Sequence, residues 1–437
     1  MKKLSLFTAA LIALGVVSQA SADNVVYLTG STAFRSSVQA ALAAGTGIFD
    51  ATPSAAYRLG SSASGSTYML FHGTIGGVST YLDCYWTGSD AGMASVANVA
   101  INNDGQPLFG APATFMKADG TVAYTTVVGD PTSAELESSS RQADIAFADT
   151  SVSSGLPAIV AANNTSPLVS YGNIAIVCFA WLKNNNSASG ASAAKTAWSD
   201  LSNITTFQMQ TLFAAGSCTA DYLTGAPADD TTMVYLVGRN KGSGTRANVL
   251  NDSQYGLTVA VAQNTIGGGL VANADGTYPA PVLTTPLQLA ACGDNGYETG
   301  GSVTTALGFP GSTTQADPFV NPYTGLNGAG WIAIGYASCS DAIKNGVTVA
   351  NWLTENGVPE SDGAIESGAY SYWGYENLYG RSNIAGTYQD ADAQLIYNAV
   401  ANSLATSGSV AANHDVGLNP AYMNCQKNTD FSTPAHN

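Results

Sequence analysis

The most informative stretch of this sequence is Val237-Gly238-Arg239-Asn240-Lys241-Gly242-Ser243-Gly244-Thr245-Arg246. An apolar run, 233–236, precedes it, and Ala247-Asn248-Val249-Leu250 follows it and can open a helix. A strand, a turn of small residues and a helix N-terminus in this order direct free backbone N–H groups and the positive end of a helix dipole at one place. A flanking arginine adds a planar fork of donors that suits a tetrahedral oxyanion. The stretch therefore predicts a turn that holds an anion.

The N-terminus predicts an exported protein. Lys2 and Lys3 precede an apolar run, 4–17, and Ala20-Ser21-Ala22 has the small side chains of a cleavage site. Residues 1–22 are therefore predicted to be a signal peptide, with the mature chain starting near Asp23. The apolar run is too short to span a membrane, and no cysteine lies at the cleavage point to carry a lipid anchor. We expect a periplasmic or secreted protein that is peripheral to the membrane at most.

Charge limits the partners of the chain. Of its 437 residues 45% are hydrophobic and 10% are charged, and the formal net charge is −16. Removal of Lys2 and Lys3 leaves 12 of the 14 basic residues against 30 acidic ones, which gives −18. A surface this acidic argues against nucleic acid as a partner. Any anion that binds must be held by local donors in a cleft of low dielectric constant.

Six cysteines are candidates for disulfides or metal binding. An exported chain permits disulfides, whereas Cys178 lies inside an apolar run and equally suits a buried free thiol. No spacing among the cysteines and histidines matches a metal site, so we expect no metal and no cofactor. The six are Cys84, Cys178, Cys218, Cys292, Cys339 and Cys425.

Strands and helices alternate along the chain. This alternation predicts an α/β fold with mostly parallel sheets. In such folds ligands bind at the carboxyl ends of strands, where loops lead into helices, and several of these loops contain Ser, Thr, Gly or Asp. Strands are expected at 25–28, 77–86, 144–149, 174–181, 234–237 and 331–336, and helices at 35–44, 93–100, 205–213 and 390–404.

Five stretches, in the same order along the chain, resemble the periplasmic phosphate-binding proteins of ABC transporters. The last stretch is the most specific, since it keeps the family's arginine and Ser-Gly-Thr at their spacing. The resemblance spans roughly residues 24–380, with long insertions at 45–75, 102–140 and 250–330. The five stretches are Leu28–Phe34, Tyr85–Gly92, Asp144–Asp149, Leu201–Phe213 and Arg239–Thr245.

The resemblance implies an α/β, two-lobed periplasmic-binding-protein fold of type II, with mixed, mostly parallel sheets, flanking helices and a hinge. One lobe would comprise residues 23–153 and 340–437, and the other residues 154–339. Crossings near 153–157 and 336–342 would form the hinge. The ligand would bind between the lobes, and closure would signal its capture to the permease of an ABC-type uptake system.

The resemblance also implies a set of ligand-binding residues. The first loop is one residue shorter than the common family pattern, so its donors would be Thr32 and Ala33 or, with the register shifted, Ala33 and Phe34. Ser89 would donate from the second loop, and Asp149 would accept. The opposite lobe would donate from Arg239, Ser243, Gly244 and Thr245.

Hydrogen phosphate is the predicted ligand. An acceptor such as Asp149 repels an anion unless that anion has a proton to donate. Hydrogen phosphate has one at neutral pH and sulfate has none, so sulfate would leave a buried acceptor unpaired. Lys241 departs from the family pattern, in which many members have an acidic residue at this position, and the departure would make the site more positive.

Each motif also has a plainer interpretation. Ser89 and Asp149 can serve as helix caps, Arg246 can be a salt-bridging residue, and Arg35 can reach the site from the helix that it begins. A second function is an extracellular or surface structural or adhesive protein that reuses this fold without a role in transport. We expect no enzyme, because the sequence contains no metal ligands and no nucleophile–base pair for a phosphate-ester hydrolase.

Overall fold

The computed structural model describes residues 23–436 except for a set of short ranges. The predicted signal peptide lies outside the described residues. None of the helices in the described part of the chain is both long and apolar enough to cross a membrane. The ranges left out are 1–22, 61, 104–105, 111–112, 139, 155–167, 186–192, 268–269, 274–276, 284–288, 309–330, 407–419, 429–433 and 437.

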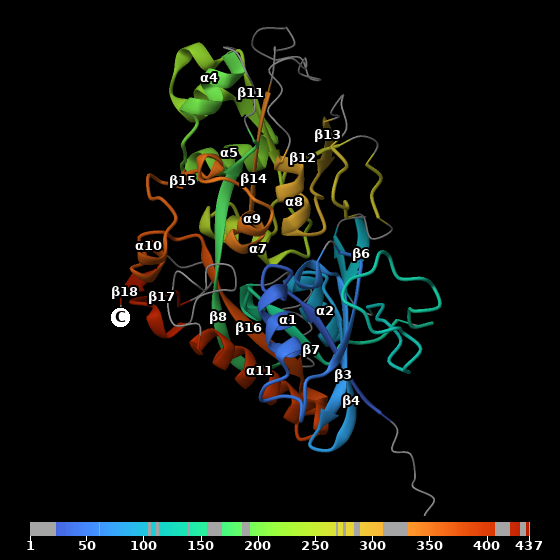
Figure 1. Cartoon of the computed structure of the whole chain (residues 1–437). Coiled ribbons are helices and arrows are strands. Elements are labelled where there is room, and N and C mark those ends of the chain that lie inside the picture. The colour runs from blue at the N-terminus through green and yellow to red at the C-terminus, as the bar shows by residue number, and fades with distance from the viewer. Residues whose placement is uncertain are drawn as a thin grey trace, which may run out of the picture.

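A 12-stranded sheet runs through two lobes, and the long strand β8 (Leu168–Lys183) belongs to both (Figure 1). The first lobe contains, in spatial order from β8, the strands β16 (Trp373–Arg381), β7 (Ile145–Ala148), β1 (Asn24–Gly30), β4 (Val78–Tyr85), β3 (Tyr68–Ile75) and β2 (Ser54–Arg58). The second lobe contains β14 (Trp331–Ser338), β11 (Met233–Val237), β12 (Gln263–Ile266) and β13 (Leu289–Gly293), with β10 (Ser217–Thr219) paired to β11. The α/β, two-lobed periplasmic-binding-protein fold expected from the sequence is therefore present.

The sheet is mixed, and its parallel pairs form two separate groups. One group is β4–β1–β7 in the first lobe, and the other is β14–β11–β12 in the second. The remaining pairs of the sheet are antiparallel, since β8 and β16 run antiparallel to their neighbours and β2, β3 and β4 form hairpins. The sheet is thus less parallel than the alternation of elements predicted, because the long connecting strands and the insertion at 45–75 add antiparallel edges.

Helices pack around both parts of the sheet. The first lobe contains α1 (Arg35–Ala44), α2 (Ser89–Ala97) and α11 (Tyr388–Thr406), and the lobe drawn above it in Figure 1 contains the others. These are α4 (Ala193–Asp200), α5 (Thr206–Ala215), α6 (Ala220–Thr224), α7 (Gly244–Asp252), α8 (Gly300–Leu307) and α9 (Cys339–Lys344), with the short α10 (Asp362–Glu366) nearby. Three two-stranded pairs complete the described elements: β5 (Ala100–Asn103) with β6 (Gln106–Gly110), β9 (Asn203–Ile204) with β15 (Thr354–Glu355), and β17 (Cys425–Gln426) with β18 (Ala435–His436).

Several helix boundaries follow from local sequence. Helix α5 has a capping box, in which Gln208 N donates to Thr205 Oγ1 at 3.3 Å and Thr205 N donates to Gln208 Oε1 at 2.9 Å. This arrangement satisfies two N–H groups that the helix itself leaves unpaired. Helix α1 spans the predicted 35–44. Helix α2 begins at Ser89 rather than at Met93, and Gly88 is its N-cap, so the cap interpretation of Ser89 is not what the structure has.

Strand pairs locate the passages between the lobes. Residues 168–178 of β8 pair with β16, and residues 179–183 pair with β14. Farther along the chain, β15 pairs with β9, and β16, which begins at Trp373, pairs with β8. Part of the predicted crossing at 153–157 lies outside the described residues, and the predicted lobe boundaries at 153/154 and 339/340 stay a prediction about which segments move together.

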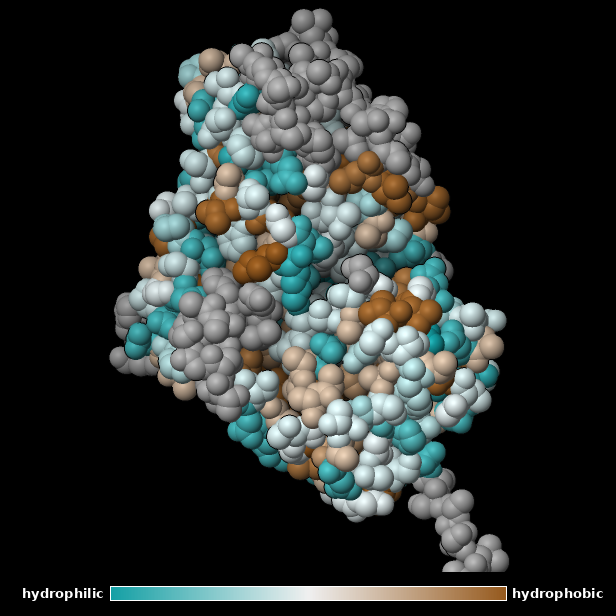
Figure 2. Space-filling model, in the orientation of Figure 1, coloured by the Kyte–Doolittle hydropathy of each residue, from teal (hydrophilic) through white to brown (hydrophobic). Residues whose placement is uncertain are grey.

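The core is continuous along the sheet from one lobe to the other. Large fully buried side chains line it, among them Trp86 in the first lobe, Trp181 on β8 and Tyr336 in the second lobe. All six cysteines are free thiols, and Cys178 is buried, which resolves the open question of disulfides in favour of thiols. On the face drawn in Figure 2, hydrophobic residues form separate groups among hydrophilic ones.

Candidate anion-binding site

The loop between β1 and α1 forms one wall of the site. Gly30 ends β1 with a φ of 119°, and a Cβ atom there would overlap the carbonyl oxygen of Phe147 on β7. Glycine permits the loop to lie this close to β7. The next residue, Ser31, donates a hydrogen bond of 2.8 Å from its N–H to the same oxygen. Thr32 follows, and it lines the space between the lobes with only 5% of its surface exposed.

Ser89 and Asp149 form a buried pair in the first lobe. Ser89 begins α2 and Asp149 follows β7, and each is 1% exposed. Ser89 Oγ donates to Asp149 Oδ1 at 2.5 Å, and Asp149 N donates to Ser89 Oγ at 3.3 Å. The parallel pairing of β1 with β4 and β7 brings the loops after these strands together. The convergence that the sequence predicted for these two residues is therefore present.

The start of α7 contacts this pair across the boundary between the lobes. A Cβ atom on Gly244 would overlap Asp149 Oδ1 and lie 2.6 Å from Ser89 Oγ. Nearby, Ala91 N donates to the carbonyl oxygen of Gly242 at 3.3 Å. Ser243 is the N-cap of α7, since its Oγ accepts a hydrogen bond of 3.3 Å from Arg246 N. The two lobes thus touch at a point where only glycine fits.

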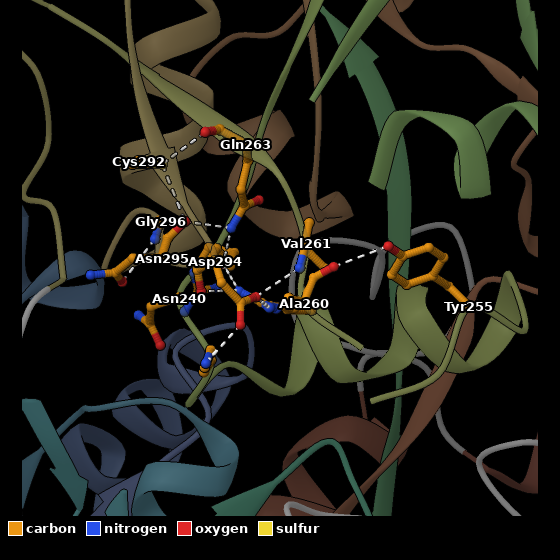
Figure 3. A network of polar contacts seen from close by, with 12 residues as sticks. Asn240, Tyr255, Ala260, Val261, Gln263, Cys292, Asp294, Asn295 and Gly296 are labelled. Carbon is orange, nitrogen blue, oxygen red and sulfur yellow. Dashed lines mark hydrogen bonds and ion pairs between the residues drawn. The ribbon is translucent and has the colours of Figure 1, made fainter. Parts of the chain in front are cut away.

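A network of polar contacts holds the loop 238–243 in shape (Figure 3). The carboxylate of Asp294 forms ion pairs with Arg246 and with Lys241, whose Nζ lies 2.6 Å from Oδ2. Arg246 Nη1 also donates to the carbonyl oxygens of Asp294, at 3.0 Å, and of Arg239, at 3.3 Å. Gln263 Nε2 donates to Arg239 O at 2.9 Å. The backbone of Arg239 is therefore fixed by side chains that are distant in sequence.

This network corrects the expectation that Lys241 makes the site more positive, because the charge of Lys241 is paired with Asp294. Arg246 is the salt-bridging residue that the plainer interpretation predicted. Burial by itself would raise the pKa of Asp294, but the charge of Arg246 and the hydrogen bond from Lys241 outweigh it and lower that pKa. The carboxylate therefore stays ionised at neutral pH.

Arg239 joins the two lobes. Its side chain is fully buried, and Nη2 donates to the carbonyl oxygen of Glu298 in its own lobe at 2.9 Å and to Thr32 Oγ1 of the first lobe at 3.3 Å. Nε donates to the carbonyl oxygen of Tyr297 at 3.3 Å. Nη1 is buried and has no hydrogen-bond partner among the described residues. One donor of this guanidinium therefore remains for a ligand.

Three of the predicted ligand residues use their groups inside the protein. Ala33 O accepts from Ser340 Oγ at 3.2 Å, and Thr245 O accepts from Tyr372 Oη at 3.1 Å. Phe34 N donates to Ser31 Oγ at 3.3 Å, and the Phe34 ring lies in the core, 1% exposed. The structure thus brings together Thr32 with Arg239, and Ser89 and Asp149 with Gly244, whereas the contacts described for Ala33, Phe34 and Thr245 are structural.

A cleft of about 1210 Å³ lies between the lobes, and of the nine predicted residues it is lined by Thr32 alone. Arg35, the first residue of α1, also lines it and is 6% exposed. Its Nε and Nη1 are buried without a partner in the described part of the chain. The sequence placed Arg35 within reach of the site but outside the main set. Its position after Thr32-Ala33-Phe34, at the helix start, was the signal.

Two carboxylates oppose the effect of burial on the pKa values of Arg35 and Arg239. Burial lowers the pKa of Arg35 and of Arg239, and Asp341 and Glu298 oppose this effect at both. Beneath the loops, Glu376 on β16 is completely buried, and burial together with the nearby Asp149 raises its pKa well above the usual range. Glu376 is therefore favoured in its neutral form. The cleft is thus lined by Arg35 and by hydrogen-bond acceptors, and Arg239 is buried behind Thr32.

Groups of three or more His, Cys, Asp or Glu side chains that could hold a metal ion do not occur among the described residues. No protein-family model matches the chain, and no curated protein matches its sequence.

Several solved structures are similar in fold. One, from Clostridium perfringens, is assigned as a phosphate ABC transporter substrate-binding protein with bound phosphate; it is 14% identical, with 85% of this chain and 93% of that chain covered and a TM-score of 0.41. An ABC-type phosphate transport receptor from Vibrio cholerae is 12% identical over 88% of this chain and 98% of that one, with a TM-score of 0.39. A phosphate binding protein from Stenotrophomonas maltophilia is 14% identical over 91% and 92%, with a TM-score of 0.36.

Proposed function

We propose that this chain binds hydrogen phosphate between its lobes and acts as an exported solute-binding protein for ABC-type phosphate uptake. The observation that carries the proposal is the guanidinium of Arg239, which is fully buried, bonds to Thr32 across the cleft and keeps Nη1 without a partner among the described residues. A buried charge that lacks part of its hydrogen bonds is costly. A phosphate oxygen is the partner that the planar fork of an arginine fits.

Other donors converge on the same region. Thr32 Oγ1 accepts from Arg239, so its hydroxyl hydrogen is directed elsewhere and can be donated to an anion. Gly244 and Thr245 begin α7, where backbone N–H groups have no partner within the helix and the dipole is positive. Ser89 lies opposite them. These donors, with Arg239 and Ser243, are the proposed ligand set, and Ala33 and Phe34 are its least supported members.

Asp149 supports a protonated ligand. Its carboxylate is 1% exposed and contributes to the charge that acts on Arg239. An oxyanion next to a buried carboxylate is repelled unless it donates a hydrogen bond, which hydrogen phosphate can do and sulfate cannot. On binding, the ligand would take the place that Ser89 Oγ has beside Asp149, or share it.

Binding between the two lobes would link capture of the ligand to a change in the shape of the protein. The proposed lobes are 23–153 with 340–437, and 154–339, and they would separate where Gly244 now contacts Ser89 and Asp149. Closure of such lobes around a ligand is the usual hinge motion of periplasmic binding proteins. The closed form would be the one that a permease recognises, and a cleaved signal peptide would deliver the chain to the compartment where this happens.

Calorimetric titration of the mature chain, starting at Asp23, tests the proposal. We expect saturable heat with phosphate in the micromolar range and none with sulfate. Absence of binding to phosphate at millimolar concentration would overturn the proposal. Asp149→Asn should bind sulfate as well, because the amide offers sulfate a hydrogen-bond donor where the carboxylate repels it.

Arg239→Ala is the sharpest variant. It should weaken phosphate binding by about 3–5 kcal/mol, because the charge-assisted pair is lost in a dry cleft. Arg141→Ala is the matched control, since the Arg141 side chain is 48% exposed, pairs with Glu137 and does not line the cleft. Equal affinities of the two variants would exclude Arg239 as the anion ligand. Circular dichroism establishes that both are folded.

A further inference from the structure

The cleft is larger than inorganic phosphate requires. Its volume is about 1210 Å³, whereas pockets of roughly 300–1,000 Å³ already hold drug-sized molecules. A phosphate ion bound at Arg239 and Thr32 would fill only one end of it. The remaining walls come from both lobes, with the β2–β3 connection near Thr67 on one side and the start of α8 near Ser302 on the other. The volume therefore leaves room for a substituent on the phosphate.

Arg35 is a buried cation that lines this cleft. It is 6% exposed, lines the cleft, and has both Nε and Nη1 buried without a partner in the described ranges. Arginine stays charged at all physiological pH values, so folding alone gains nothing from burying these donors unpaired. Arg35 and Arg239 are influenced by the same two carboxylates, Asp341 and Glu298, which places both arginines in one electrostatic environment. Two arginines suit the double charge of a phosphoryl group.

The rest of the lining suits hydroxyl groups. Carboxylates of Glu298 and Asp341 face the cleft and are hydrogen-bond acceptors that a second anionic group would find repulsive. Hydroxyl and amide side chains, which donate and accept, lie between them at Thr299, Ser302 and Asn345. A ligand with one anionic end and several neutral hydroxyls matches this distribution of charge.

Two stacked tyrosines form an aromatic wall of the cleft. Tyr68 and Tyr85 line the cleft and stack on each other, with ring centroids 4.6 Å apart and an interplanar angle of 23°. Stacked rings of this kind present an apolar face with polar edges, which suits the alternating C–H and O–H groups of a sugar. The aromatic rings and the acceptors line the same cleft as Arg35 and Thr32.

We propose that the cleft takes a phosphate monoester of a sugar or a similar polyol, with the phosphoryl group against Arg35 and Thr32, the residue that Arg239 contacts from behind, and the hydroxyls against Glu298, Asp341 and the Tyr68–Tyr85 wall. This inference rests on the proposed function, since it assigns the same anion site a larger ligand. Glucose 6-phosphate is the probe, with inorganic phosphate and glucose as its two halves. Glucose 6-phosphate should bind at least about tenfold more tightly than phosphate, and glucose alone should not bind.

Gly301→Leu tests the use of the cleft. A Cβ at Gly301 of α8 meets its neighbours only at ordinary contact distances, with Thr299 Oγ1 at 3.5 Å and Asn345 Nδ2 at 3.6 Å, so a leucine there would extend into the cleft. The variant should reduce binding of glucose 6-phosphate by at least about tenfold and leave phosphate binding within about twofold. Gly363→Leu in α10 is the control, because a Cβ there meets no atom within 4 Å and the residue does not line the cleft.

Arg35→Met tests the second arginine. It should weaken both phosphate and glucose 6-phosphate by at least about tenfold without lowering the melting temperature of the unliganded protein, because two of the donors that it removes, Nε and Nη1, have no partner among the described residues. A residue with a purely structural role would lower the melting temperature instead. Arg141→Met, from an exposed position, should change neither quantity.

The outcomes separate the two proposals. Binding of phosphate but not of glucose 6-phosphate, or equal loss of both ligands in Gly301→Leu, would overturn the monoester assignment and leave phosphate binding standing. Binding of glucose 6-phosphate without phosphate would support the monoester and overturn uptake of the free ion. Binding of neither would overturn both proposals.

Discussion

Arg246 and Arg35 are both buried near the starts of helices, yet their surroundings differ. Arg246 on α7 is 3% exposed and forms an ion pair with Asp294, while its Nη1 donates to two carbonyl oxygens. Arg35 on α1 is 6% exposed, and its Nε and Nη1 have no partner among the described residues. The first arginine uses its donors to hold the protein together, and the second has two donors that no other described residue accepts from.

The difference indicates how the site is built. The loop 238–243 is rigid because distant side chains, Asp294 and Gln263, bond to its backbone and its cations. Arg239 starts from that fixed backbone and extends to Thr32 on the other lobe. A donor that is aimed by a satisfied network loses little freedom on binding, so more of its interaction energy contributes to affinity.

The largest loss of stability should come from replacing Arg246, the arginine whose donors bond to other residues. Arg246→Met would leave the carboxylate of Asp294, whose side chain is 21% exposed, with Lys241 and the N–H of Val261, and two carbonyl oxygens without this donor. We expect the free energy of unfolding to fall by about 3 kcal/mol. Urea unfolding followed by tryptophan fluorescence measures it. Arg35→Met is the matched substitution, and a similar loss in that variant would contradict the contrast drawn between the two arginines.

The next effect concerns the contact between the lobes. Gly244→Ala would place a methyl group on Asp149 Oδ1 and near Ser89 Oγ. Relief of this overlap needs movement of a buried pair or separation of the lobes, which should cost about 1–3 kcal/mol of stability and weaken phosphate binding by about tenfold or more. In Gly363→Ala the new methyl meets no atom within 4 Å, so a small gain in stability is expected there. Unchanged affinity in Gly244→Ala would show that the ligand does not need this contact.

Local sequence was sufficient for part of the site. The strand–turn–helix order around Ser89, Asp149 and Gly244 predicted that these residues converge, and the structure brings them into contact. Strands that pair in parallel place the loops after them at one edge, so this part of the geometry follows from pattern alone. The family resemblance placed Thr32 and Arg239 on opposite sides of the site, and in the structure the two share a hydrogen bond.

The rest depends on contacts that local pattern does not contain. Lys241 forms an ion pair with Asp294, which lies in the segment 250–330 that the sequence identified only as an insertion. The charge of Lys241 was therefore expected to act on the site. Arg35 lines a cleft whose opposite wall includes Glu298 and Asp341, again from segments without a recognisable motif. Strand β8 begins at Leu168, before the apolar run 174–181 that predicted it. The sequence did not predict this first part of the strand, because its residues are not fully buried and lack a continuous hydrophobic pattern.

The buried carboxylate of Asp392 tests, with a smaller expected effect, how burial and ion pairing change the pKa of an acidic side chain. Burial raises the pKa of Asp392 on α11 to about 6, the opposite direction to the paired Asp294. A raised pKa in the folded state means that stability is greatest below the unfolded pKa, about 3.9, and is lost as the pH rises through about 6. Asp392→Asn should therefore raise the free energy of unfolding at pH 8 by about 1–2 kcal/mol and change it little at pH 4. An equal effect at both pH values would point to packing rather than charge.

The smallest effect should come from Lys241, where the sequence departs from the pattern that it otherwise follows. Its Nζ lies 2.6 Å from Asp294 Oδ2, and its side chain is only 10% exposed, so its charge is already compensated within its own loop. Arg246 keeps Asp294 ionised and in place when Lys241 is replaced. Lys241→Gln should therefore cost at most about 1 kcal/mol of stability and leave phosphate affinity within about twofold of the parent chain. A tenfold loss of affinity at low ionic strength that disappears in high salt would instead show that the charge of Lys241 reaches the ligand.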